Sequence, residues 1–326
     1  MREGEPGDLV AAVRADPVLA PFAEAIISYA RPCIRLRPHR DADRYLGESR
    51  VGGRPSVPVG FRWPTRYVDM PAPSPAWVAA QYFEPRLLPA DGQSTFQFIA
   101  QVDLAAVAPF DVDRLLPPDG TLLFFYDEFY QSDINPSTGE PTSWSIRDGK
   151  PEFYLREFGY DLTDQVRVIH LAAGLTLRPS DDGPFAEHAL PLVASQEITL
   201  PSGESYVVAA ETTDEELEGQ VVLPPDAWQR LAELDYEHRA NLAIDQMLGW
   251  PDVYSHGLLP PPELGGWSSI PVTDLLREAL DVRLLLQLSP ATYEQTGIRF
   301  GRTLYFYVRE SDLRRGEFSR AWYDSD

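Results

Sequence analysis

The residues best suited to chemistry lie in a short strand-like segment near the N-terminus. Arg35 and Arg37 alternate with apolar residues, and His39 follows them beside further charged side chains. Guanidinium groups bind carboxylates and phosphates, and an imidazole can exchange a proton near neutral pH. The pattern predicts part of a ligand groove or, as the plainer alternative, the solvated end of a strand.

Glutamines and tryptophans elsewhere in the chain extend this candidate groove. Gln101 and Gln287 each end an apolar strand, where a buried amide needs hydrogen-bond partners. His256 follows a Gly-Trp-Pro turn, and two tryptophans can line a cleft. The full set of ligand-groove candidates is Arg35, Arg37, His39, Gln101, Trp63, Trp250, His256 and Gln287. A structural role in a turn or a loop is the alternative for each of them.

Patterns of known catalytic and metal sites are missing from the sequence. It contains no phosphate-binding loop, dinucleotide fingerprint, zinc-protease helix or nucleophile elbow. Asp111-Val-Asp113 begins like a calcium loop, but Leu115 and Leu116 stand where a ligand and a glycine are required. The one cysteine, Cys33, has no base beside it and is expected to be a buried thiol. Catalytic residues are therefore unknown, and we expect neither a metal site nor a cofactor.

The net charge limits the classes of partner. The formal charge is −22, from 28 basic and 50 acidic residues in a chain of 326. Nucleic acids and anionic membranes are bound through basic surfaces, so neither is expected as a partner. An acidic surface instead accelerates encounter with a basic protein and makes that encounter sensitive to salt. A basic protein partner is the expectation, and a small-molecule ligand stays unidentified.

Apolar periodicity predicts the elements that would position these side chains. A helical segment occupies residues 1–32, where Asp16 can cap a helix with an apolar stripe. Buried strands are expected where apolar residues run nearly without interruption. Strands are predicted at 96–102, 121–126, 166–171, 205–210, 282–288 and 303–308. Helix is expected over 211–248 and again near Glu310–Leu313.

The two halves of the chain repeat one order of motifs. The first half contains VGGRP, FIAQVD and GTLLFFYDE, and the second contains MLGWP, LLLQLS and GRTLYFYVRE. Each half therefore has a Gly-Pro turn, a strand that ends in Gln plus an apolar residue, and an aromatic strand. We expect an α+β fold of mainly antiparallel sheets with an internal pseudo-two-fold duplication, behind the N-terminal helical segment. Chance similarity of two buried strand pairs is the alternative.

These motifs also carry a family resemblance. RVGGRPSVPVGFRWP, FIAQVDLAAV, LPPDGTLLFFYDE, DQMLGWP, DVRLLLQL and GRTLYFYVRESDLRRGEFSRAW resemble the YwqG-like bacterial proteins, a domain of unknown function, over about residues 33–324. The resemblance implies an α+β protein built largely from sheets with internal duplication, and it implies no reaction or cofactor. Some members lie in gene neighbourhoods of toxin and immunity type. Where such proteins often have a histidine, this chain has Asp245-Gln246.

Two function classes follow from these observations. The first is a non-catalytic binding or interaction protein, with an immunity-type partner as one form of it. The second is an enzyme of unassigned class with a groove between the halves. The predicted domain covers residues 33–326, with halves at about 33–210 and 211–326. The expected location is the cytoplasm, because the sequence has no secretion signal and no apolar run long enough to span a membrane.

Overall fold

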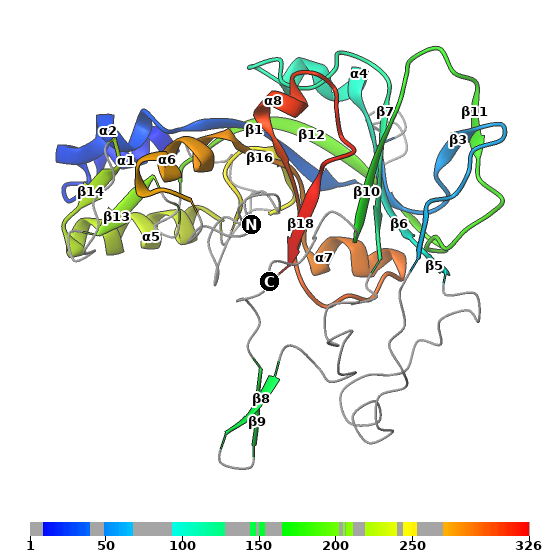
Figure 1. The fold of residues 1–326 in the computed structure, drawn as a ribbon. Coiled ribbons are helices and arrows are strands. Elements are labelled where there is room, and N and C mark those ends of the chain that lie inside the picture. Colours follow the sequence, from blue (N-terminus) through cyan, green and yellow to red (C-terminus); the bar gives the residue numbers. More distant parts are fainter. Residues whose placement is uncertain are drawn as a thin grey trace.

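A ten-stranded sheet forms the centre of the protein in the computed structural model (Figure 1). The structure describes residues 9–39, 49–67, 93–127, 144–147, 150–153, 165–201, 205, 207–210, 219–239, 244–252 and 270–325. Neighbouring strands of this sheet pair antiparallel throughout. In spatial order the strands are β10 (Val166–Leu171), β7 (Thr121–Tyr126), β6 (Gln97–Asp103), β2 (Arg50–Gly52), β12 (Ala189–Thr199), β1 (Arg31–Pro38), β15 (Gln246–Leu248), β16 (Val282–Leu288), β17 (Leu304–Arg309) and β18 (Trp322–Ser325).

On each side of the two central strands, β12 and β1, the remaining strands follow one another toward the edge of the sheet in sequence order. Beyond β12 follow β2, β6, β7 and β10, and beyond β1 follow β15, β16, β17 and β18. The β6–β7 ladder shifts register between Phe98 and Ala100, and the β16–β17 ladder shifts between Leu284 and Leu286. Each of these irregularities lies the same number of residues before a glutamine, Gln101 in β6 and Gln287 in β16.

The sheet is curved so that one face encloses the largest apolar core. All ten strands contribute residues to this core, among them Phe124 of β7 and Phe306 of β17. The two rings pack edge to face with centroids 5.2 Å apart, although six strands separate β7 from β17 in the sheet. Alternate side chains of a strand point to opposite faces, so the other face carries its own smaller apolar clusters.

A second apolar core joins the N-terminal helices to later parts of the chain. The helices α1 (Leu9–Ala15), η1 (Ala20–Phe22) and α2 (Ala23–Ile27) pack against α5 (Pro225–Arg239) and the parallel pair β13 (Val208–Ala210) and β14 (Val221–Leu223). Asp16 accepts hydrogen bonds from the backbone N–H groups of Val18 and Leu19, so it caps a turn that precedes η1 and not the start of the helix that was expected there. Figure 1 shows this group of elements beside one end of β1 and β12.

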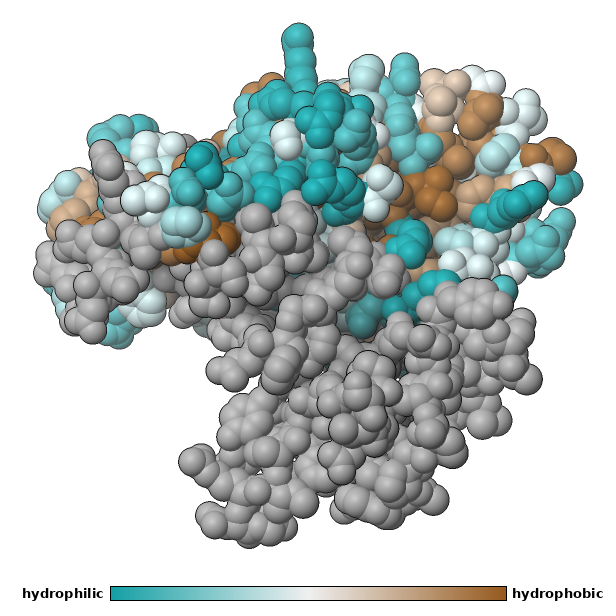
Figure 2. All heavy atoms as spheres, in the orientation of Figure 1, coloured by the Kyte–Doolittle hydropathy of each residue, from teal (hydrophilic) through white to brown (hydrophobic). Residues whose placement is uncertain are grey.

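Short elements complete the described chain. They are α4 (Leu104–Val107), η3 (Ala108–Phe110), α6 (Val272–Asp281), α7 (Pro290–Tyr293), η6 (Glu294–Thr296) and α8 (Glu310–Leu313), with the strand pairs β3 (Ser56–Pro58) and β11 (Leu177–Pro179), β4 (Thr65–Tyr67) and β5 (Gln93–Thr95), and β8 (Trp144–Arg147) and β9 (Lys150–Phe153). Figure 2 shows hydrophobic side chains gathered over the region of β3 and β11 and hydrophilic ones over α8.

The predicted fold class is confirmed as α+β with mostly antiparallel sheets. The strands expected at 121–126, 166–171 and 282–288 occur with those bounds, and so does the helix at Glu310–Leu313. The helix expected over 211–248 is wrong on both sides of α5 (Pro225–Arg239), because among the described residues Val221–Leu223 is strand β14 and Gln246–Leu248 is strand β15. Strand β15 pairs with both β1 and β16, and those backbone bonds replace the helical ones.

Candidate functional site

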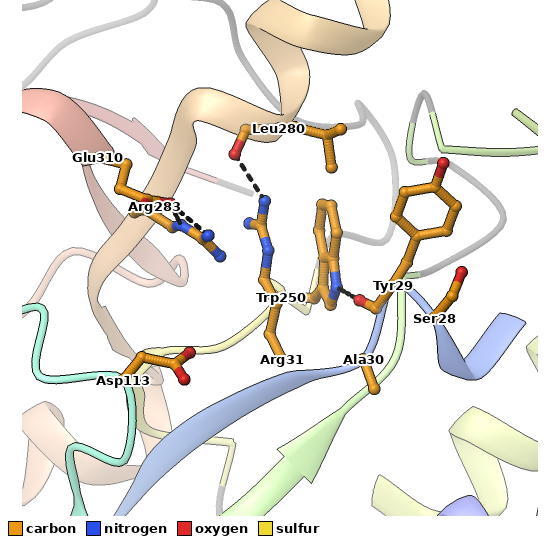
Figure 3. A pocket seen from close by; sticks show the side chains of 9 residues that line it. All are labelled: Ser28, Tyr29, Ala30, Arg31, Asp113, Trp250, Leu280, Arg283 and Glu310. Atoms are coloured by element: carbon orange, nitrogen blue, oxygen red, sulfur yellow. Dashed lines mark hydrogen bonds and ion pairs between the residues drawn. The ribbon is translucent and has the colours of Figure 1, made fainter. Parts of the chain in front are cut away.

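A cavity of about 340 Å³ lies where the N-terminal segment meets the start of β16 (Figure 3). The segment before β1, the turn after β15 and the end of α6 contribute to its wall. The lining residues are Ser28, Tyr29, Ala30, Arg31, Asp113, Trp250, Leu280, Arg283 and Glu310. Since these residues come from distant parts of the sequence, the tertiary structure alone assembles the cavity.

Arg31 is the central side chain of this cavity. Its residue is 6% exposed, and its guanidinium lies 3.6 Å from the centroid of the Trp250 ring. It donates to the backbone oxygens of Val282 at 3.0 Å and Leu280 at 2.9 Å. A guanidinium has five N–H donors, so these two bonds leave others for a ligand. Burial desolvates the cation and Arg283 repels it, and together they hold the pKa of Arg31 well below its usual value.

Trp250 is held in place from two sides. Its ring nitrogen donates to the backbone oxygen of Tyr29 at 2.6 Å, and its backbone N–H donates to Thr199 Oγ1 at 2.7 Å. The ring belongs to the second apolar core. One face of a rigid aromatic ring therefore supports the Arg31 cation, an arrangement whose attraction increases as water is removed.

Arg283 and Glu310 form an ion pair on another wall. Nε and Nη2 of Arg283 both bind Glu310 Oε2, the first at 2.7 Å, and Arg314 Nη2 contacts Oε1 at 2.7 Å. Burial alone would raise the pKa of Glu310, but the hydrogen bonds from Arg283 and Arg314 outweigh it and hold the pKa below its ordinary value. Glu310 is therefore a carboxylate at neutral pH.

Asp113 is the remaining charged residue of the cavity. It is exposed, in the turn after η3, and no ion pair links it to another residue of the described chain. Figure 3 shows its carboxylate on the side of Arg31 away from Trp250. The cavity thus presents two guanidinium groups, one paired and one free carboxylate, and an aromatic ring.

A second cavity, of about 490 Å³, lies at the start of β12 and beside η6. Its lining residues are Gln97, Phe185, Ala186, Glu187, His188, Glu294, Gln295, Thr296, Gly297, Ile298 and Arg299. Gln97 stands four residues before Gln101, as Arg283 stands four residues before Gln287. This second cavity has Glu187 and Arg299 as exposed charged residues and no buried cation in its lining.

The predicted glutamines hold turns. Gln101 Oε1 accepts the backbone N–H of Ser56 at 2.8 Å, and Gln287 Oε1 accepts that of Asp252 at 2.9 Å. Gln287 Nε2 also donates to the backbone oxygen of Ile244 at 2.8 Å. Both glutamines are fully buried, and neither lines the two cavities.

The predicted arginines are joined through a buried glutamate. Arg35 Nε lies 2.9 Å from Glu197 Oε2, and Arg37 Nη2 lies 2.6 Å from Glu197 Oε1. His39, just beyond β1, donates its backbone N–H to the oxygen of Pro191 at 2.9 Å. Its Nε2 has no hydrogen-bond partner among the described residues. Neither cavity includes these three side chains.

The two tryptophans lie in different places, and His256 lies outside the described residues. Trp63 donates its ring N–H to the backbone oxygen of Phe96 at 2.7 Å and packs edge to face on Phe125, with centroids 5.3 Å apart. Trp250 alone of the predicted residues lines the first cavity. The main residue that sequence reasoning missed is Arg31, whose signal was a lone arginine between a helical pattern and Pro32.

The described part of the chain lacks the features of a metal centre and of a membrane-spanning helix. No group of three or more His, Cys, Asp and Glu residues within it could hold a metal ion. None of its helices combines the length and apolar character needed to cross a bilayer.

Comparison with known proteins gives one family. Residues 49–326 match the sequence model of a family described as "Domain of unknown function (DUF1963)". This range includes Trp250, Arg283 and Glu310, whereas Arg31 precedes it. A search of the curated proteins found no match.

Proposed function

The chain belongs to the family described as a domain of unknown function (DUF1963), which names no activity, and from the cavity beside Trp250 we propose that it is a non-catalytic binding protein for a small molecule. The observation that carries this proposal is the environment of Arg31. A buried cation is stable when a carboxylate or another anion is close to it. The direct partners of Arg31 are two backbone carbonyls and an aromatic ring, and it faces a cavity. The Glu310 carboxylate also attracts Arg31, but its hydrogen bonds go to Arg283 and Arg314.

Several polar residues that could have served catalysis have structural partners, which supports binding over chemistry. Gln101 and Gln287 hold turns, and Arg35 and Arg37 share one buried carboxylate. Within the first cavity, Glu310 is ionised and paired with two arginines, so it is a poor general acid at neutral pH.

The test is retention of a small molecule from a complex mixture. The purified protein is dialysed against a metabolite extract, and released compounds are identified by mass spectrometry. Because Ser28 is exposed on the cavity wall, Ser28→Trp should narrow the cavity and weaken retention, while Ser28→Ala should not. Retention that is equal in both variants, or absent from the wild-type protein, would contradict the proposal. Conversion of the retained compound would favour an enzyme of unassigned class.

A basic protein partner is a second candidate, supported by the formal charge of −22. Attraction between opposite charges in water weakens as salt shortens the screening length. Capture from a native lysate at low salt should therefore yield a basic protein that is released at high salt. Capture with no basic protein at low salt would remove this candidate, including its immunity-type form.

We also propose that the two halves of the sheet arose by internal duplication. Alignment on the two buried glutamines supports it, because each accepts the N–H of the residue after a Gly-X-Pro turn. In this alignment Phe124 and Phe306 correspond and touch each other. Strand β1 then belongs with the strands of the second half, although it comes first in the chain. We further propose that the chain is YwqG-like, because it carries the six motifs, and that it is cytoplasmic, because it has one cysteine.

A further inference from the structure

The charges around the first cavity sum to zero. Arg31 and Arg283 supply two positive charges, and Asp113 and Glu310 supply two negative ones. Glu310 is bound to Arg283, so the pair contributes little net field at a distance. Among the described residues, the charges of the cavity without an ion-pair partner are therefore the Arg31 cation and the Asp113 carboxylate, while Arg283 still lines the cavity and can make a direct contact.

The positive side of the cavity is arranged for a carboxylate. Arg31 repels Arg283, and burial removes the water that would screen this repulsion. An anion placed between two guanidinium groups converts repulsion into two attractive contacts. A planar carboxylate suits this position, because guanidinium forks match its two oxygens.

The negative side is arranged for a cation. Asp113 faces the same cavity and forms no ion pair with the rest of the described chain. A ligand with only negative charge would be attracted by Arg31 and repelled by Asp113, in a protein that already carries a net charge of −22. A ligand with charges of both signs avoids this repulsion.

We infer that the cavity binds a small zwitterion, an amino carboxylate whose carboxylate lies at Arg31 and Arg283 and whose ammonium lies at Asp113. The size allows such a ligand, since one water molecule needs only about 10–15 Å³ of the same kind of space and the cavity offers about 340 Å³. This inference rests on the proposed function and adds the ligand class to it.

The second cavity offers a matched comparison. When the strands are aligned on Gln101 and Gln287, Glu187 stands at the place of Arg31 and Arg299 at the place of Asp113. Its charges are thus reversed, and its arginine is exposed. Substitution of Arg299 removes a charge of the same sign as Arg31 without changing the first cavity.

The experiment is calorimetric titration of the full chain with three sets of probes. The amino acids are glycine, L-leucine and 4-aminobutanoate. Each is paired with the acid that lacks the ammonium (acetate, 4-methylpentanoate and butanoate) and with the amine that lacks the carboxylate (methylamine, 3-methylbutylamine and propylamine). At least one amino acid should bind, and its acid should bind more weakly by about two- to fivefold, the range expected for one exposed ion pair.

Variants assign each end of the ligand. Asp113→Asn lies in an exposed turn and should abolish the preference for the amino acid over its acid, whereas Asp119→Asn, also exposed, should keep it. Arg31→Met should weaken binding by at least about tenfold, and Arg299→Met should not. If the acids bind as tightly as the amino acids, or if Asp113→Asn keeps the preference, the zwitterion assignment is wrong. If none of the probes binds, while the protein still retains a compound and Ser28→Trp weakens that retention, the ligand class is wrong and the proposed function stands.

Discussion

Phe124 and Phe306 pack edge to face at the centre of the main core, with ring centroids 5.2 Å apart and an interplanar angle of 75°. Phe124 belongs to β7 and Phe306 to β17, strands near opposite edges of the ten-stranded sheet. Contact between them requires the sheet to curve until its two halves face each other. The same curvature brings Tyr126 of β7 against Tyr323 of β18, at 4.9 Å between centroids.

The Phe124–Phe306 contact should be measurable as a coupling energy. Phe124→Leu and Phe306→Leu should each destabilise the protein, and the double variant should lose less than the sum, by about 0.5–1.5 kcal/mol for an aromatic pair. Urea unfolding of the four proteins gives this value. A parallel cycle with Phe98→Leu and Phe306→Leu should be additive, because these rings lie in different apolar clusters. A coupling near zero in the first cycle would contradict the facing arrangement.

The buried glutamines should matter for stability. Gln101→Leu and Gln287→Leu each leave a buried backbone N–H without its acceptor, at a cost of about 1–3 kcal/mol. Gln287→Leu also removes the hydrogen bond that Gln287 donates to the backbone oxygen of Ile244. Unfolding in urea measures both, with Gln229→Leu on the exposed face of α5 as the control. Equal stability of all three variants would show that the turns do not depend on these amides.

Asp245 should make stability fall as the pH rises. This side chain is fully buried and accepts from the Ser289 N–H at 2.7 Å and from the Thr292 hydroxyl. Burial raises its pKa above 3.8, and the two hydrogen bonds only partly oppose this. The folded state therefore holds a proton that the unfolded state releases, and the contribution of this group to stability declines above pH about 4.

Asp245→Asn removes the titrating carboxyl group, so this difference in bound protons between the folded and unfolded states disappears. The stability of the variant relative to the wild-type protein should increase as the pH rises from about 4 to about 8. Urea unfolding across that range measures the difference in free energy of unfolding between the two proteins. The contributions of other titrating groups cancel in this difference. Asp182→Asn, at an exposed position, should show no such trend. If the difference in free energy of unfolding between the two proteins did not change with pH, the pKa of Asp245 would have to be the same in the folded and unfolded states.

Cys33 should be inert in the folded protein. The thiol is buried in β1, and burial raises its pKa to about 11. At pH 7 the reactive thiolate is then about one part in ten thousand. Labelling with a maleimide should proceed only as fast as the protein unfolds, whereas the exposed variant Asp182→Cys should label at once. Rapid labelling of Cys33 under native conditions would contradict this environment.

Sequence reasoning succeeded where local patterns decide the structure. β7, β10 and β16 were predicted with their bounds, because runs of apolar residues of this length can only be buried strands or short helices and the flanking turns exclude helices. Asp16 was identified as a cap from its position before Pro17. These features depend on neighbours in the sequence.

Sequence reasoning failed where pairing with strands that are distant in the sequence decides the structure of a segment. Gln246–Leu248 follows a helical pattern, yet becomes a strand because β1 and β16 each offer it a ladder. β12 was not predicted as one long strand, since polar residues interrupt its apolar pattern. Two of them, Glu197 and Thr199, are buried, and both pair with residues of β1. Propensity yields to pairing when many backbone bonds are gained together.

The sequence by itself determined the α+β class, the acidic character, the lone thiol and the matched order of turns and strands. Only the tertiary structure decided which polar residues line a cavity. In the folded protein Gln101 and Gln287 bind turns, and Arg35 binds Glu197. Arg31 instead lies against Trp250 in the cavity that Asp113 and Arg283 also line. The reason is physical: a cavity forms from side chains that meet across a curved sheet, and spacing along the chain carries no measure of that curvature.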